Sequence, residues 1–298
     1  METGIESRAM KFKLQRGGVR KSTRDKDAEE LVKQIKGDEG QIVSRKLFQN
    51  KDSPVQKYQQ KSNEMYQYHI ANTLPFGDDS TRLMKNSLYF EYTGRMTAFI
   101  QELDRLKQQI VGDQSVYQHV IDDDIIARNQ SLYAQAKSPT ANQTDYLSFD
   151  EMERRLYITW YAEPIATSGD FRFEIPDEMK KALDDNLSNA LREAKEELRV
   201  RLMGPMKALV DKLAVPIGEE GCVFRNTLVT NLTEMVDQLP HLNLDDDPEI
   251  EAVRQKLADI IKPYEGRENE LRLFSGPRSK AKQDVEQLMK DLSGGWKV

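Results

Sequence analysis

The sequence predicts an all-α protein, an elongated helical bundle with long antiparallel helices of coiled-coil type and at most a minor β element near residues 171–175. The main observation is the stretch 176–215, in which apolar side chains recur every three or four positions. This spacing is the period of an α-helix and not of a strand. The apolar positions are Met179, Leu183, Leu187, Leu191, Ala194, Leu198, Leu202, Met206, Leu209 and Leu213. At about 1.5 Å per residue, one helix here would be about 60 Å long, so other helices must lie along it.

A second long helix, predicted at 81–111, carries a heptad pattern. Its apolar residues alternate steps of four and three, which places them at the a and d positions of a coiled coil. A seam of this kind in a chain of low apolar content favours self-association. The sequence therefore predicts an oligomer interface formed by Tyr92, Met96, Phe99, Leu103, Leu106 and Ile110.

The composition supports long helices with large exposed faces, since 38 % of the 298 residues are hydrophobic and 32 % are charged. Cys222 is the single cysteine, which excludes an internal disulfide and a cysteine-based zinc site. No apolar run approaches the ~18 residues of a membrane span. The first residues lack the apolar core of a signal peptide. We therefore expect a cytoplasmic protein that has no membrane partner.

Positive charge is concentrated at the N-terminus, where residues 1–24 are predicted to form a basic flexible arm. The chain has a formal net charge of −6, and the region from 8 to 24 contains basic residues and no acidic one. The basic residues are Arg8, Lys11, Lys13, Arg16, Arg20, Lys21 and Arg24. Such an arm is a solvated leader, folds against the acidic body, or binds an anionic partner such as nucleic acid. Lys57 and Lys61 are auxiliary nucleic-acid candidates because they lie among tyrosines, although aromatic residues at helical spacing also form cores.

The rest of the chain divides into an N-terminal helical subdomain at 25–80, a long-helix bundle at 81–215 and C-terminal helices at 216–298 packed on the bundle. Helices are expected at 25–36, 53–70, 81–111, 114–137, 148–160, 176–215, 223–239, 247–262 and 277–291.

Several helix ends are indicated by their capping residues. Ser53-Pro54 and Asp247-Pro248 each combine an N-cap residue with proline at the first helical position. Ser148 and Glu151 have the spacing of a capping box. Gly204-Pro205 is expected to kink the long helix, because proline removes a backbone donor.

Motifs that suggest catalysis have simpler interpretations. The run Gly17–Thr23 resembles a phosphate-binding loop, but Arg20 stands where that loop needs a glycine, and no strand is predicted before it. Asp122–Asp124 and Asp245–Asp247 lack the glycine and distal glutamate of a calcium loop, so Asp247 is interpreted as a helix cap and 122–124 as a surface acidic patch. The sequence predicts no catalytic residue, no metal site and no cofactor, and therefore no enzyme.

Eight features follow one another between residues 44 and 293. They are Lys46-Leu47-Phe48, a tyrosine-rich helix, Leu74-Pro75-Phe76, the Tyr92–Ile110 helix, Tyr161–Pro164, Phe171-Arg172-Phe173, the long central helix and Phe224-Arg225-Asn226-Thr227-Leu228. In this order they resemble a helical family of phage and prophage proteins known only as a domain of unknown function. The resemblance implies a phage or bacterial origin, an interaction role and the cytoplasm of a bacterial host. Members of the family are often encoded near an AAA-type ATPase, which implies such an ATPase as a possible partner.

The sequence thus predicts a non-enzymatic, phage-type helical interaction or assembly protein that associates with itself. One alternative is a nucleic-acid-binding protein that uses the basic arm. Another is an adaptor for an AAA-type ATPase.

Overall fold

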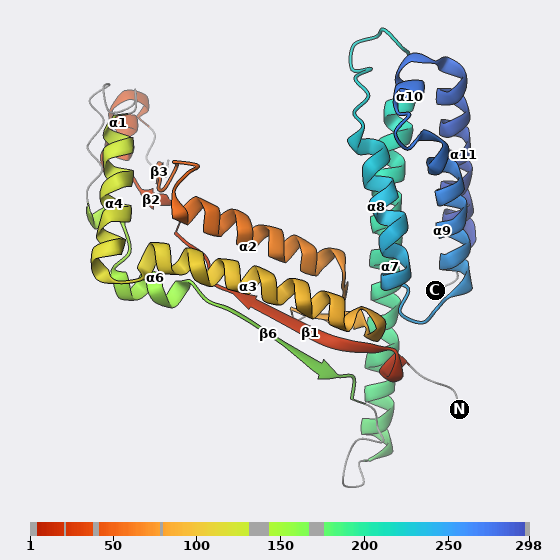
Figure 1. Cartoon of the computed structure of the whole chain (residues 1–298), viewed down its shortest axis with the longest axis horizontal. Helices are drawn as coiled ribbons and strands as arrows, with labels where there is room; N and C mark the ends of the chain where they lie inside the picture. The colour runs from red at the N-terminus through yellow and green to blue at the C-terminus, as the bar shows by residue number, and fades with distance from the viewer. Residues whose placement is uncertain are drawn as a thin grey trace. The chain divides into compact units, whose positions relative to one another are not determined.

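The computed structural model describes residues 5–20, 22–37, 42–77, 80–130, 143–166 and 176–295. They belong to two compact units, whose elements are labelled in Figure 1. Unit 1 comprises Met1–Lys13, Ile70–Tyr92 and Tyr161–Val298, and unit 2 comprises Leu14–His69 and Thr93–Trp160.

The predicted all-α class is wrong. The protein is 68 % helical, but it also contains a four-stranded antiparallel sheet and is therefore a mixed α/β protein. The strands of this sheet follow the order β4-β5-β1-β6. They are β1 (Ala9–Arg16), β4 (Leu74–Pro75), β5 (Thr81–Lys85) and β6 (Ile158–Pro164). Two short strands, β2 (Ser22–Arg24) and β3 (Ser44–Lys46), form a separate antiparallel pair. The β element expected at 171–175 lies outside the described residues.

The strand β1 forms where the sequence predicts a basic arm. Burial alternates along the middle of this strand, since Phe12 and Leu14 are buried while Lys11 and Lys13 are only half-buried. A strand turns successive side chains to opposite faces, so the lysines share one face and the apolar residues the other. The ring of Phe12 lies edge-on to that of Tyr92, with the two ring centroids 5.0 Å apart. The basic segment therefore includes a strand with an apolar face, which its net charge does not indicate.

Unit 1 is built around one long helix. Its elements are η1 (Ile5–Ser7), η2 (Asn86–Leu88), α7 (Asp177–Ala214), α8 (Thr227–Leu242), α9 (Pro248–Ile261), η5 (Lys262–Tyr264), α10 (Asn269–Leu273) and α11 (Ser275–Gly295). Helices α8, α9 and α11 lie beside the C-terminal part of α7 (Figure 1).

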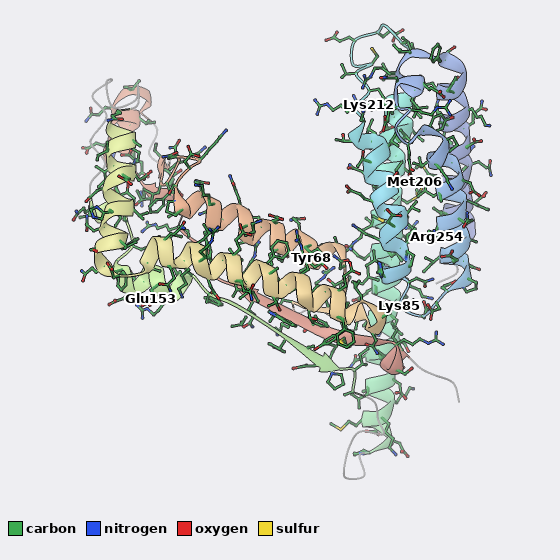
Figure 2. The ribbon with its side chains drawn as sticks, in the orientation of Figure 1. Tyr68, Lys85, Glu153, Met206, Lys212 and Arg254 are labelled. Carbon is green, nitrogen blue, oxygen red and sulfur yellow. The ribbon has the colours of Figure 1, made fainter. Side chains whose placement is uncertain are left out.

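The predicted helix at 176–215 corresponds to α7, which continues through Gly204 and Pro205. Its apolar stripe is buried from Ala190 to Leu213, and Met206, which Figure 2 labels, is fully enclosed. Met179 in the first turn is 53 % exposed. The predicted helix is thus confirmed, but only the later part of its apolar stripe is buried by the rest of unit 1.

Arg278 closes the C-terminal end of α7. Its side chain is only 4 % exposed, and its guanidinium donates hydrogen bonds to backbone carbonyl oxygens alone. Nε donates to Leu213 at 3.0 Å, Nη1 to Leu271 at 3.1 Å, and Nη2 to Val215 at 2.6 Å and to Lys212. The last carbonyls of a helix have no partner within it and carry the negative end of its dipole. A buried cation at this end therefore satisfies them and ties α10 and α11 to α7.

The aspartates at 245–247 connect α8 to α9. The Asp247 carboxylate accepts a hydrogen bond from the amide of Glu249 at 2.8 Å, which confirms its predicted role as an N-cap. Lys195 of α7 bridges Asp245 at 2.8 Å and Asp247 at 3.1 Å. These ion pairs connect α7 to the segment between α8 and α9.

Asp246 has a left-handed backbone, with a φ of 57°. Aspartate and asparagine tolerate this conformation better than most residues. Its carboxylate accepts a hydrogen bond from Lys85 of β5 and lies 3.5 Å from the Arg8 guanidinium. The Lys85 contact is the main reason that the pKa of Asp246 lies below its usual value, although partial burial opposes the shift.

Unit 2 contains α1 (Lys26–Lys36), α2 (Pro54–Ala71), α3 (Tyr89–Val111), α4 (Gln114–Asn129), η3 (Gln143–Asp145) and α6 (Phe149–Arg155), although the ends of α2 and α3 belong to unit 1. The capping box predicted at Ser148 and Glu151 is confirmed. The predicted helix at 81–111 begins later than expected, because 81–85 form β5.

Asp124 is buried, which corrects its placement in a surface patch. Its carboxylate accepts hydrogen bonds from the Phe48 amide at 2.9 Å and the Tyr146 hydroxyl at 2.7 Å. Phe48 has a φ of 53°, which is unusual for a bulky residue. A buried carboxylate with two donors therefore fixes a strained turn in unit 2.

We expect Arg278→Met to lower the free energy of unfolding by about 3 kcal/mol, because it leaves several buried carbonyls without a donor. Chemical denaturation of the full chain measures this change. Lys280→Met removes an exposed cation from the same helix and is the matched control. Equal stability of the two variants would show that the Arg278 hydrogen bonds do not hold this end together.

We expect Asp246→Asn to cost less than about 1 kcal/mol at neutral pH, because the lost pairs are partly exposed. A carboxyl whose pKa is lowered by folding stabilises the protein above its unfolded pKa, and this contribution is lost on acidification. The difference in unfolding free energy between wild type and variant should therefore shrink as the pH falls below about 4. Denaturation across this pH range tests the expectation, with Asp211→Asn, at an exposed position of α7, as the control. A difference that is independent of pH would contradict it.

Candidate functional site

Four large apolar side chains are exposed at one end of the helices of unit 1. Ile217 (45 % exposed) and Val223 (67 %) belong to the connection between α7 and α8, and Leu273 (61 %) and Phe274 (58 %) lie where α10 meets α11. Figure 1 shows this connection and α10 at the same end of the helices. We call these four residues the apolar end.

Hydrogen bonds hold the backbone of the apolar end in place. Arg272 donates from Nη2 to the carbonyl of Phe224 at 3.2 Å and to Asn226 Oδ1 at 2.8 Å. Lys212, labelled near this end of α7 in Figure 2, donates to the carbonyl of Gly221 at 3.3 Å. The exposed side chains therefore project from a connected framework that also includes Arg278.

The apolar end is not among the sites that the sequence predicts. A usable signal was present, since Leu273-Phe274 precedes Ser275-Gly276-Pro277. Paired large apolar residues beside a glycine and a proline fall outside any continuous helical stripe. Only the folded structure, however, shows that these side chains are left uncovered, since Leu271 of the same segment is buried in the core of unit 1 while Leu273 and Phe274 stay exposed.

The predicted oligomer seam lies inside the protein. All six residues are 4 % exposed or less, namely Tyr92, Met96, Phe99, Leu103, Leu106 and Ile110. In unit 2, α2 runs beside α3 (Figure 1), and the rings of Tyr68 and Phe99 have centroids 5.8 Å apart. Among the described residues, the heptad side chains thus pack against this chain's own residues.

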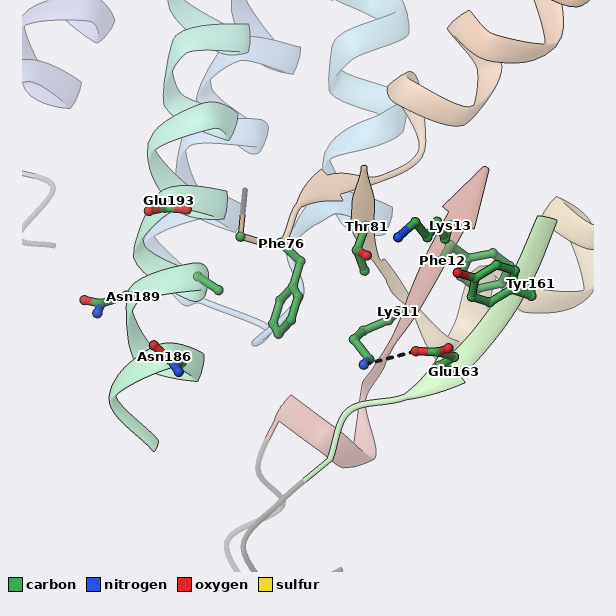
Figure 3. A pocket seen from close by; sticks show the side chains of 12 residues that line it. Lys11, Phe12, Lys13, Phe76, Thr81, Tyr161, Glu163, Asn186, Asn189 and Glu193 are labelled. Atoms are coloured by element: carbon green, nitrogen blue, oxygen red, sulfur yellow. Dashed lines mark ion pairs between the residues drawn. The ribbon is translucent and has the colours of Figure 1, made fainter. Parts of the chain in front are cut away.

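In unit 1, two basic residues of the expected arm are paired with acids. Arg8 lies beside Asp246, and Lys11 Nζ lies 3.2 Å from the Glu163 carboxylate. Figure 3 shows the Lys11–Glu163 pair in a cavity of about 600 Å³, which Lys13 also lines. The other lining groups include Phe76, Thr81, Tyr161, Asn186, Asn189 and Glu193. Both charge signs and neutral amides line this cavity, so its chemistry selects no particular ligand.

In unit 2, the basic candidates fall into two groups. Arg24 pairs with Glu29 at 2.8 Å, and Lys61 pairs with Glu64 at 2.7 Å and Glu102 at 3.2 Å. Among the basic candidates of unit 2 that the structure describes, Arg16, Arg20 and Lys57 have no carboxylate partner. Lys21 lies outside the described residues. The expected arm is therefore not one continuous run of available positive charge.

Gly17 follows β1 directly, so a strand does lead into the run that resembles a phosphate-binding loop. The Gly17 amide donates to the Tyr157 carbonyl at 2.9 Å, and a Cβ at Gly17 would lie 1.8 Å from the Arg155 carbonyl oxygen. Gly18 has no atom within 4 Å of such a Cβ. Glycine at 17 is thus required by close backbone packing.

The described residues contain no group of three or more histidine, cysteine, aspartate or glutamate side chains that could hold a metal ion. None of the helices in these ranges is both long and apolar enough to cross a membrane.

Comparisons of the chain with protein-family models, with curated proteins and with solved structures found no significant match. The resemblance to a phage family therefore stays a prediction.

We expect Gly17→Ala to destabilise the protein by about 2 kcal/mol or more, because the new methyl group must displace backbone atoms. Gly18→Ala is the matched control, since open space receives its methyl group, and we expect no loss or a gain of about 0.5 kcal/mol. Thermal and chemical unfolding of both variants measure the contrast. Similar stabilities for the two would contradict the packing seen at Gly17.

Proposed function

We propose that this protein is a non-enzymatic helical interaction or assembly protein that associates with a second copy of itself through the apolar end. The supporting observation is the exposure of Ile217, Val223, Leu273 and Phe274 on a framework held by hydrogen bonds. Large apolar side chains left exposed at one end of a folded unit, with charged residues beside them, are typical of a protein-interaction site.

A second copy is a suitable occupant because the border of the apolar end contains both charge signs. Glu219 and Glu220 are exposed in the α7–α8 connection, and Arg225 and Arg272 are exposed on the segments beside it. In a twofold dimer the same patch meets itself, so each acid of one copy can face a base of the other. A border of a single sign would instead repel its own copy.

The small size of the patch implies a weak complex. A stable interface buries about 800 Å² per partner, and four side chains supply only part of that area. The border must contribute the rest, so we expect an equilibrium between monomer and dimer at micromolar concentrations.

The family resemblance supports a phage origin and the cytoplasm of a bacterial host as the setting of this function. It also suggests an AAA-type ATPase as an alternative occupant of the apolar end. Such an adaptor would retain an ATPase in a pull-down, whereas self-association needs only a second copy of this chain, so a pull-down without any ATPase would count against the adaptor.

Replacing both Leu273 and Phe274 by serine should weaken self-association by about tenfold or more, because each large apolar side chain contributes over 1 kcal/mol when buried. Sedimentation equilibrium from low to high micromolar concentration measures this effect. The thermal unfolding midpoint should stay close to that of wild type, since both side chains are exposed.

Met179→Ser is the matched control, because it removes a similarly exposed apolar side chain from the opposite end of α7. We expect its association to equal that of wild type. A wild-type protein that stays monomeric throughout the range, or a double variant that associates as wild type does, would refute the proposal.

A further inference from the structure

A cavity in unit 2 has the chemistry of an anion site, and its occupant is independent of the apolar end. It measures about 260 Å³ and lies between the end of β1 and helix α2. Its lining residues are Arg16, Gly17, Gly18, Val19, Tyr58, Gln59, Ser62 and Asn63. Cavities for whole cofactors are generally larger than about 300 Å³, so this one suits a single small group.

Arg16 brings an uncompensated positive charge to the cavity. Its Nη1 donates to Ser62 O at 2.9 Å, Ser62 Oγ at 3.2 Å and Asn63 Oδ1 at 3.0 Å. All these acceptors are neutral, and Nε and Nη2 have no hydrogen-bond partner among the described residues. The guanidinium carbon lies 4.2 Å from the centre of the Tyr66 ring, which orients the group.

Neighbouring cations differ from Arg16 because they have carboxylate partners. Arg95 also stacks on a ring, that of Phe99 at 4.7 Å, but its guanidinium has Glu64 as a partner at 3.7 Å. Lys61 is paired with two glutamates. A half-buried guanidinium with only neutral partners is stabilised by an anion, and its planar fork matches the oxygens of a phosphate or carboxylate.

Other donors surround the same space. The Gly18 amide donates to no group within the described ranges, and open space lies where a side chain would stand. Tyr58 lines the cavity, and burial raises the pKa of its hydroxyl to about 12, with a smaller contribution from the exposed Asp104 carboxylate. A tyrosine hydroxyl keeps its proton at neutral pH, as at its ordinary pKa, and can donate a hydrogen bond. Gln59 and Asn63 supply amide groups beside it.

We propose that the cavity at Arg16 binds a phosphate group, with Arg16 as the charged ligand and the Gly18 amide, Tyr58 hydroxyl and Gln59 amide as neutral donors. No carboxylate lines this cavity, so its donors favour a dianion over a neutral ligand. The phosphate can belong to a small phosphorylated molecule or to the backbone of a nucleic acid. In the second case, Arg20 and Lys57 are available in the same unit as further phosphate contacts.

The first test uses inorganic phosphate and the full-length protein. Phosphate should raise the thermal unfolding midpoint of wild type more than chloride does at equal ionic strength, because a ligand of the native state stabilises it. Arg16→Met should weaken phosphate binding by about tenfold or more, because it removes the charge-assisted hydrogen bonds. Gln59→Glu places a carboxylate in the cavity and leaves Arg16 unchanged, so it should also weaken phosphate binding. It serves as a second variant in case Arg16→Met does not fold.

Arg95→Met is the matched control, since it removes a ring-stacked arginine that does not line the cavity. It should keep the wild-type response to phosphate. A second arm measures the anisotropy of a labelled single-stranded oligonucleotide. Binding that depends on Arg16 and is competed by phosphate identifies nucleic acid as the source, whereas phosphate binding without oligonucleotide binding identifies a small phosphorylated molecule.

Two results would overturn the proposal. One is a phosphate effect of the same size in wild type, Arg16→Met and Gln59→Glu. The other is the absence of any effect specific to phosphate in wild type, together with oligonucleotide binding that is absent or independent of Arg16.

Discussion

Burial of the apolar stripe on α7 is the constraint on which unit 1 depends. An isolated helix is only marginally stable in water, so a helix of 38 residues is held chiefly by what covers its apolar face. One continuous core joins Ala194–Leu213 to side chains of α8, α9 and α11. The same core includes Leu74 and Leu83 from the sheet. Helices and strands that are distant in sequence thus meet in unit 1 because they cover one helix.

One side chain closes the C-terminal end of that stripe and also bonds the segment that carries part of the apolar end. Beyond Leu213 the chain must satisfy the carbonyls that α7 leaves unpaired, and Arg278 does so from α11. The same guanidinium donates to the carbonyl of Leu271 in α10, while the following Leu273 and Phe274 stay exposed. The segment bonded to the cap of α7 therefore also carries two side chains of the apolar end.

Local sequence signals identified those parts of the fold that depend on local chemistry. The period of α7, the Asp247 cap and the Ser148 capping box involve residues within a few positions of one another, and each could be predicted. The sheet could not be predicted in this way, because β1 is held by backbone pairing with β5, which is distant in sequence. Lys11, for example, pairs with Leu83. The heptad residues of α3 show a related limit, since their spacing predicts burial but not whether the partner helix belongs to the same chain.

Anion binding by the basic segment also cannot be predicted from local sequence alone. Counting residues from Arg8 to Arg24 indicates an arm that seeks an anion, yet Arg8, Lys11 and Arg24 each lie beside a carboxylate of this chain. A paired cation attracts an external anion only weakly, because its own partner already screens it. Arg16 differs because its neighbours Ser62 and Asn63 offer oxygen atoms without negative charge. The capacity of a basic segment to bind an anion therefore depends on which of its cations the fold leaves without a carboxylate, and net charge alone does not contain that information.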